Sequence, residues 1–197
     1  TYWMAPTAVG AGDGSSSGNA ANYLDASFWN GIQSLLQVTN VNVNFANGNY
    51  NAGTLNLNDM GNPVHRLTLQ AVNPDGPVFS TTGNNIVGIT GSQNIKFDGI
   101  VFTGPCSSWG VICQPDYLNP CRNLEFSNCQ FINLTNAYYG AIGLANGPRD
   151  ILVSSCTFSN LTDNNGNHQH MIYASHDVVD LVVTNCLFQD CLADYIR

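Results

Sequence analysis

A repeat of about 28 residues runs along most of this 197-residue chain and limits what it can fold into. The segment NLEFSNCQF at 123–131 is matched by DILVSSCTF at 150–158 and by DLVVTNCLF at 180–188. An earlier copy begins at residue 94 and fainter ones at 40 and 66, so successive starts are 26, 28, 29, 27 and 30 residues apart. Each copy is therefore expected to be one structural unit that stacks on the next.

Apolar and polar residues alternate within each copy, which is the pattern of a strand with one buried face. A second short apolar run precedes most copies, and turns rich in Asn and Gly separate the two runs. Strand-only units of this length cannot bury their inner faces alone. We therefore predict an all-β solenoid of about six coils over residues 40–197.

Stacked coils place equivalent residues about 4.8 Å apart along the axis, so these residues form ladders. We expect an aromatic ladder of Phe102, Phe131, Phe158 and Phe188, and a buried thiol ladder of Cys129, Cys156 and Cys186 beneath Ile100. One turn position is expected to hold Asn133, Asn160 and Asp190. The oppositely charged Lys96 and Glu125 are expected to face outward on neighbouring coils.

Residues 1–39 are expected to lead into the coils and to close one end of the stack. The segment ASFWNGIQSLLQ at 26–37 predicts a helix with Ser27 as its N-cap and an apolar stripe formed by Phe28, Ile32, Leu35 and Leu36. Such a helix would cover strand edges that an open stack exposes. The sequence stops at Arg197 in mid-pattern, so we expect the coils to be incomplete at this end or to stack there on a partner.

Charge is scarce, with 9% charged residues and a formal net charge of −8. Four Arg and one Lys cannot neutralise many phosphates, which argues against a nucleic-acid partner. The 44% share of hydrophobic residues argues against disorder. No apolar run approaches the ~20 residues of a membrane-spanning helix. Stacking explains this composition, because like charges repel at coil spacing and Asn and Gly suit the turns.

The seven cysteines are an odd number, so at least one thiol is free unless chains are cross-linked. No two cysteines form a CxxC pair, and the four His residues do not complete a zinc pattern, so a structural zinc site is not expected. Cys106, Cys113 and Cys121 lie in an irregular insertion, where we expect a disulfide, most simply Cys106–Cys121, unless a reducing compartment leaves all seven thiols free. Low Lys content and the solenoid favour secretion. Asn133 and Asn160 are also sequons, although the turn ladder is the preferred role for both.

The coils, the entry GAGDGSSSGNAANY at 10–23 and the helical segment together resemble the right-handed parallel β-helix, or pectin-lyase-like, superfamily over roughly residues 8–197. The resemblance implies right-handed coils behind an N-terminal capping helix. It also implies an extracellular protein that handles polysaccharide along one face of the solenoid. The superfamily includes polysaccharide lyases, glycoside hydrolases, uronan epimerases, phage tailspikes and non-catalytic adhesins, so the fold does not by itself assign a reaction.

Subfamily motifs are missing from the sequence. It has no stacked Asp cluster of the kind that holds Ca²⁺ in pectate lyases, and none of the NTD, DD, GHG and RIK motifs of polygalacturonases. Ser175-His176-Asp177 is only faintly similar to the DPHD-type tetrad of mannuronan epimerases. The resemblance therefore leaves Ca²⁺ open as a cofactor and identifies no subfamily.

The densest group of reactive side chains is the segment NHQHMIYASHD at 167–177. Its candidate catalytic residues are His168, His170, Tyr173 and His176, with Arg149 nearby. β-Elimination from a uronic acid needs a base near C5, an acid for the leaving oxygen and a cation for the carboxylate. His and Tyr can supply the first two groups, and Arg149, Arg197 or a bound cation the third.

The candidate substrate-binding residues are Tyr138, Tyr139 and Asp177. The two tyrosines are included because aromatic faces suit sugar rings. Two other interpretations stay open for this segment. His168 and His170 could be loop residues that bond turn carbonyls, or they could bind a metal with Asp177, since residues two apart on a strand share a face.

The sequence thus predicts a secreted, polysaccharide-active β-helix protein whose partner is an acidic polysaccharide. A lyase is favoured over a glycoside hydrolase, because hydrolases need two carboxylates at a fixed separation. The alternative is a non-catalytic structural or adhesive module that binds glycans or self-associates end to end into a longer fibre. A third interpretation is a fragment of a larger enzyme.

Overall fold

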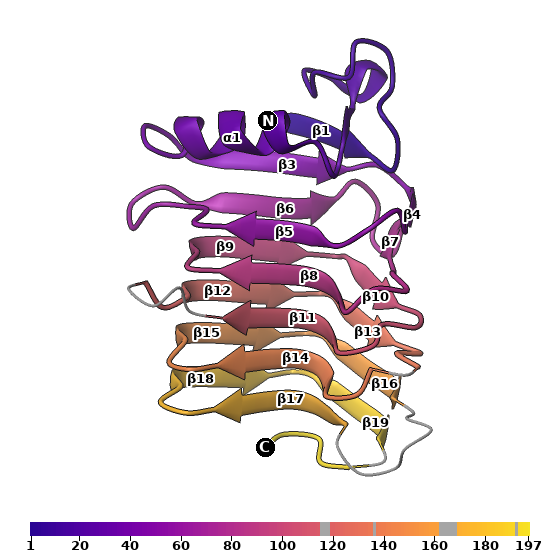
Figure 1. Ribbon diagram of the computed structural model, residues 1–197, viewed down its shortest axis with the longest axis vertical. Coiled ribbons are helices and arrows are strands. Elements are labelled where there is room, and N and C mark those ends of the chain that lie inside the picture. The colour runs from indigo at the N-terminus through magenta and orange to yellow at the C-terminus, as the bar shows by residue number, and fades with distance from the viewer. Residues whose placement is uncertain (115–118, 136, 162–168, 192) are drawn as a thin grey trace.

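The computed structural model describes residues 1–114, 119–135, 137–161, 169–191 and 193–197. The described chain winds as a right-handed parallel β-helix, with three parallel sheets as the walls of a stack (Figure 1). Each turn passes through sheet A, bends into sheet B and returns through sheet C. Right-handed crossovers are the ones that twisted parallel strands favour.

Sheet A consists of β1 (Tyr2–Ala5), β2 (Ala21–Asn22), β3 (Val41–Phe45), β6 (Leu67–Ala71), β9 (Gln93–Asp98), β12 (Arg122–Ser127), β15 (Arg149–Ser154) and β18 (Val179–Thr184). Sheet B consists of β4 (Gly48–Tyr50), β7 (Pro77–Phe79), β10 (Val101–Thr103), β13 (Gln130–Ile132), β16 (Thr157–Leu161) and β19 (Leu187–Cys191). Sheet C consists of β5 (Leu55–Asn58), β8 (Asn85–Thr90), β11 (Trp109–Gln114), β14 (Gly140–Ala145) and β17 (His170–Ser175). The helices are α1 (Ala26–Leu35) and the 3₁₀ turn η1 (Ser17–Asn19).

The predicted all-β solenoid is confirmed, and the strands of sheet A from β3 onward each begin within one residue of a predicted repeat start. The number of coils differs slightly from the expected six. About five turns are complete, and the sixth contributes β18 and β19. Residues 194–197 then run beside β17, with a parallel bridge between Ile172 and Ile196.

Ladders of equivalent side chains fill the interior as predicted. Adjacent rings of Phe102, Phe131, Phe158 and Phe188 stack with centroids 4.8, 4.9 and 4.8 Å apart. Such stacking adds to the stabilisation from burying the rings. The outward Lys96 and Glu125 pair in register on β9 and β12, also as predicted.

All seven thiols are free, so the expected Cys106–Cys121 disulfide is wrong. Cys106 lies before β11 and Cys121 lies after it, so the strand holds the two residues at opposite ends. Both side chains are buried, and the Sγ atom of Cys121 lies 3.1 Å from the carbonyl oxygen of Gln114. Burial raises the pKa of the Cys106 thiol to about 12, which keeps it protonated.

The predicted turn ladder is present at Asn133, Asn160 and Asp190, whose φ angles are 52°, 54° and 57°. Asn and Asp tolerate this left-handed conformation better than other side chains. The Nδ2 of Asn160 donates to the Oδ1 of Asn133 over 2.7 Å, which links successive turns.

Helix α1 lies over the first turn at the N-terminal end of the stack, as predicted (Figure 1). Its N-cap is Asp25 and not Ser27: the Asp25 carboxylate accepts from the backbone N–H groups of Ser27 and Phe28. Trp29 and Ile32 are the buried residues of the helix. In the part of the chain described here, no helix has the length and apolar character that a membrane crossing requires.

Candidate functional site

A cleft of about 320 Å³ opens on the outside of sheet C towards the C-terminal end of the stack. Its lining consists of Trp109, Tyr139, His170, Tyr173 and Arg197. Parallel pairing brings them together from four turns: Trp109 is the first residue of β11, Tyr139 precedes β14, His170 begins β17 and Arg197 lies beside β17. The cleft is therefore a product of stacking and not of one sequence segment.

Two glycines of β14 make room for the cleft. A Cβ atom on Gly143 would lie 2.8 Å from the Trp109 indole and 2.6 Å from Ile112, so only glycine lets the indole lie against this strand. Gly140 has a φ of +142°, and a Cβ there would collide with the backbone carbonyl of His170. Both positions allow neighbouring turns to approach closely at the cleft floor.

The aromatic rings of the cleft form one connected group. The Trp109 and Tyr139 rings stack with centroids 5.4 Å apart and planes 15° apart. Trp109 also lies 6.0 Å from Tyr173, whose ring stacks on His170 at 5.1 Å. Trp109 is only 9% exposed whereas Tyr139 is 46% exposed, so Trp109 supports the group and Tyr139 presents a ring to solvent.

Charged groups meet this aromatic group at one side. The Nδ1 of His170 lies 3.5 Å from the Oδ2 of Asp194, and the same oxygen lies 3.9 Å from the Arg197 guanidinium. His170 is 5% exposed, whereas the Arg197 side chain is 63% exposed. Arg197 is thus a cation at the mouth of the cleft that can meet an anionic ligand.

The structure brings together part of the predicted site. Tyr139, His170 and Tyr173 line the cleft, and the Tyr138 ring packs edge-on against Tyr139 at 4.7 Å. Their expected proximity on adjacent turns is therefore observed. His168 lies outside the described residues.

Other predicted residues lie elsewhere. His176 and Asp177 are exposed in the turn after β17, with φ angles of 50° and 60°. Asp177 follows His170 by seven positions, most of them in the extended strand β17, so the two residues lie roughly 20 Å apart. Arg149 is the first residue of β15, which follows the turn after β14. It therefore lies near the C-terminal ends of the sheet C strands, whereas the cleft lies near their N-terminal ends. The structure thus does not unite these three residues with the cleft, and His170 and Asp177 cannot share a metal ion.

Trp109 was not among the residues predicted from the sequence. Trp109 begins β11 within the irregular insertion and gave no repeat signal, because the positions paired with it on the neighbouring turns are Asn85 and Gly140. Arg197 was considered only as one of several cations for a carboxylate.

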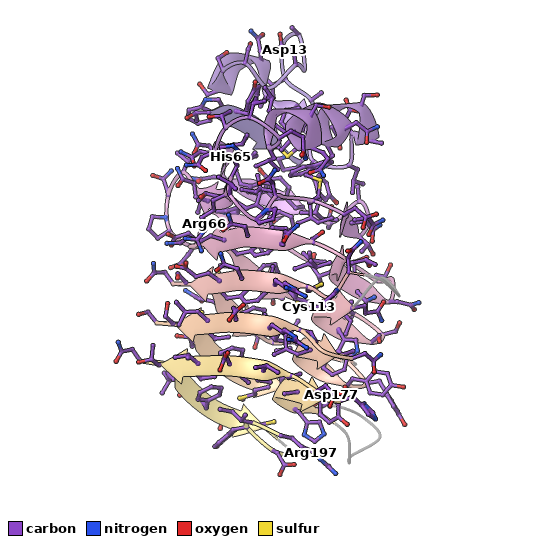
Figure 2. All side chains as sticks on the ribbon, turned by 90° about the vertical axis from the view of Figure 1, so that its left-hand side faces the viewer. Asp13, His65, Arg66, Cys113, Asp177 and Arg197 are labelled. Atoms are coloured by element: carbon purple, nitrogen blue, oxygen red, sulfur yellow. The ribbon has the colours of Figure 1, made fainter. Side chains whose placement is uncertain are left out.

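Sheet A carries a second polar group on its outer face, built around Lys96 and Glu125, which are the only Lys and the only Glu of the chain. Glu125 contacts Lys96 at 3.1 Å and Arg66 at 2.6 Å, and Lys96 also contacts Asp98 at 3.0 Å. Figure 2 shows Arg66 and His65 towards the N-terminal half of the stack, well above Asp177 and Arg197. Because every charge in this group has an opposite partner, it joins turns and is a poorer candidate for ligand binding.

Metal binding has no support in the described part of the chain, where no three His, Cys, Asp or Glu side chains gather closely enough to hold an ion. Ca²⁺ prefers six to eight oxygen ligands. The described residues do not fit that requirement, so no chemical step is assigned to Ca²⁺.

No family model matches this sequence, and no curated protein matches it. Solved structures do match the fold. A pectate lyase, Pel9A, superposes with a TM-score of 0.70 at 16% identity, over 94% of this chain and 46% of its own. An alginate lyase from Paenibacillus sp. strain FPU-7 gives 0.53 at 13% identity, over 81% of this chain and 64% of its own.

A mannuronic acid specific polysaccharide family 6 lyase from human gut microbiota gives a TM-score of 0.56 at 12% identity, over 100% of this chain and 51% of its own. The chain therefore spans less than two thirds of each of these structures. Similarity at such low identity concerns the fold, and it confirms the pectin-lyase-like β-helix.

Proposed function

We propose that this protein is secreted and that it binds an acidic polysaccharide in the sheet C cleft and cleaves it by β-elimination. The observation that carries the proposal is the convergence in one cleft of a group of stacked aromatic rings with Tyr139 exposed, a phenol beside an imidazole, and a solvent-facing guanidinium. Support also comes from the three matched structures, whose names describe polysaccharide lyases.

Each group has a role in the proposed reaction. Tyr139 and the Tyr173 ring give flat apolar faces for sugar rings, with Trp109 behind them. Arg197 pairs with the uronate carboxylate, which acidifies the C5 proton. A base takes that proton, its electron pair forms the C4=C5 double bond, and the C4–O bond breaks as the leaving oxygen is protonated.

Tyr173 is the proposed proton-transfer group because its hydroxyl belongs to a half-exposed side chain that lines the cleft. His170 is too buried to reach a polymer and stacks on Tyr173, so we assign it a positioning role. Asp194, whose Oδ2 lies 3.5 Å from the Nδ1 of His170, can fix the orientation of that ring beside the phenol.

The test combines product formation with binding on a panel of uronic-acid polysaccharides. Tyr173→Phe keeps the ring and removes the hydroxyl, so the ultraviolet absorbance of unsaturated product should form at least about 100-fold more slowly with binding little changed. The matched control for Tyr173→Phe is Tyr2→Phe in β1, which should leave product formation unchanged. Trp109→Ala should weaken polysaccharide binding several-fold. An inactive wild-type protein whose binding is also unaffected by Trp109→Ala would refute the whole proposal.

The alternative is a glycan-binding module without catalysis, and it predicts binding that depends on Trp109 with no unsaturated product. Its fibre version is favoured by apolar side chains exposed at the last turn, namely Val179, Val182, Leu187, Tyr195 and Ile196. Helix α1 covers the opposite end, so a fibre built by end-to-end stacking lacks a second open surface. Light scattering that shows no growth in mass with concentration would exclude self-association.

A further inference from the structure

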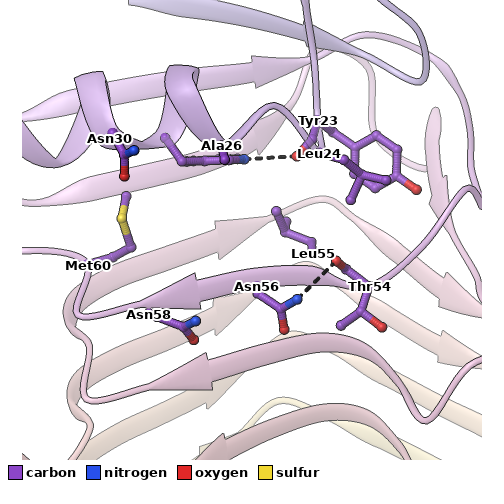
Figure 3. Close-up of a pocket in the computed structure, with 10 residues that line it drawn as sticks. Tyr23, Leu24, Ala26, Asn30, Thr54, Leu55, Asn56, Asn58 and Met60 are labelled. Carbon is purple, nitrogen blue, oxygen red and sulfur yellow. Dashed lines mark hydrogen bonds between the residues drawn. The ribbon is translucent and has the colours of Figure 1, made fainter.

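A second cavity, of about 310 Å³, lies at the other end of the molecule, between helix α1 and strand β5. Figure 3 shows Asn30 pointing from α1 towards Met60, with Asn56 and Asn58 on β5 below. Strand β5 is the terminal strand of sheet C, and among the described residues no further strand covers its edge towards the helix. The cavity occupies this gap.

The lining combines amides with an apolar floor. Asn30, Asn56 and Asn58 are exposed, and the side chains of Asn30 and Asn58 make no hydrogen bond to described residues. Buried Tyr23, Trp29, Leu55 and Met60 form the apolar part. The indole N–H of Trp29 already donates to the Tyr23 carbonyl over 2.8 Å, so the amides are the groups left to contact a ligand.

None of the ten described residues that line this cavity carries a charge. An ionic ligand would therefore be desolvated there without an opposite charge, which is unfavourable. A primary amide both donates and accepts hydrogen bonds, which matches hydroxyl groups that do the same. At the small end of the roughly 300–1,000 Å³ range of ligand pockets, the cavity suits a compact ligand.

The edge of β5 is closed at both ends by side chains. The Tyr23 hydroxyl accepts from the Gly53 N–H at 3.0 Å, before the strand. After the strand, Gln33 donates to the Asp59 carbonyl at 2.6 Å and accepts from the Gly61 N–H at 2.9 Å. A peptide that paired as a new strand beyond both ends of β5 would have to displace these bonds, whereas a ligand confined to residues 54–58 would not.

We propose that this cavity is a second glycan site, one that takes an uncharged sugar residue, with Asn30, Asn56 and Asn58 bonding its hydroxyl groups. The site does not depend on the chemistry proposed for the sheet C cleft. Asn56 nevertheless lies in the same outward column as Tyr173, four strand spacings or about 19 Å along the stack. A polysaccharide with both neutral and acidic residues could therefore contact both sites.

The experiment measures binding of neutral gluco-, manno- and galacto-configured trisaccharides to the full chain by calorimetry and by backbone amide chemical shifts. At least one should bind and shift the signals of residues 54–60. Asn30→Ala/Asn56→Ala should weaken it about five- to tenfold, because two hydrogen bonds are lost. Asn42→Ala, an exposed strand amide on sheet A, is the control and should leave affinity unchanged.

Two outcomes would overturn the proposal: no binding by any neutral trisaccharide, or binding that the double variant does not weaken. If peptides from an extended-peptide library bind at β5 and the sugars do not, the edge of β5 is a site for strand addition, and the sugar proposal is rejected. The Asn30→Ala/Asn56→Ala variant should still bind uronic-acid polysaccharide, and Trp109→Ala should still bind the neutral trisaccharide. The two sites are thus measured separately, and the failure of one proposal can be distinguished from the failure of the other.

Discussion

At the scale of single residues, the charges of Lys96 and Glu125 show how a charge-poor chain uses the few it has. Burial raises the pKa of Glu125, but hydrogen bonds from Ser127 and Lys96 and the positive charges of Arg66 and Lys96 outweigh it and lower that pKa below its usual 4.5. Burial lowers the pKa of Lys96, and its bonds to Asp98 and Glu125 outweigh that effect and raise it.

Glu125→Gln should destabilise the fold by about 1–2 kcal/mol at neutral pH, because a half-buried carboxylate with several charge-assisted bonds is lost. Since the folded pKa is depressed, this stability is present above pH 4.5 and is lost as the pH falls through the lower folded value. Urea denaturation of both proteins at neutral and acidic pH checks this. A difference that stays constant down to the lowest pH would contradict the assigned cause.

Residues that depend on the repeat could be predicted from the sequence, and residues that depend on a departure from it could not. The column containing Lys96 and Glu125 follows from the period alone, and so does the position of Tyr139 beside His170 on the next turn. Trp109 reaches the cleft only because Gly143 on the next turn lacks a side chain. The fit of the Trp109 indole against Gly143 depends on one residue from each of two turns, and neither residue recurs at the repeat period.

At the scale of elements, the capping helix shows a similar limit. Its position and apolar face were predicted from residues 26–37, and Ile32 is buried as expected. Its first turn was misassigned by two residues, because Asp25 and Ser27 are both good N-caps and the sequence does not show which backbone N–H groups lie within reach. The carboxylate of Asp25 reaches two of them.

Asp25→Ala should therefore destabilise the protein by about 1 kcal/mol, since two N–H groups lose their acceptor. Ser27→Ala, inside the first turn, should change stability by less than about 0.5 kcal/mol. Thermal and urea unfolding of the two variants side by side makes the comparison. An equal loss of unfolding free energy in the two variants, or a larger loss for Ser27→Ala, would contradict the assignment of Asp25 as the N-cap.

At the scale of the whole molecule, each turn depends on its neighbours, as in other repeat proteins. Phe131 stacks between two rings and is fully buried, whereas Phe188 ends the ladder and is half-buried. The same residue type therefore occupies two different environments that differ only in the number of turns around them.

Phe131→Ala should cost about 3–5 kcal/mol, as expected for a large buried side chain. Phe188→Ala should cost roughly half as much, because less apolar area leaves water and the last turn can relax. Hydrogen exchange should show loss of protection spreading over the central turns in the first variant and confined to β18 and β19 in the second. Equal unfolding free energies would mean that the last turn is as tightly coupled as the middle.

The capped end and the stacking order together set a direction for folding during synthesis. Among the described residues, no backbone pairing joins segments more than two turns apart, and most join strands one turn apart. We therefore expect each strand that leaves the ribosome to pair with the strand of the turn before it, while α1 covers the edge of the first turn against other strands. A chain rich in parallel pairing, which ordinarily folds slowly, avoids long loop closures by being built one turn at a time.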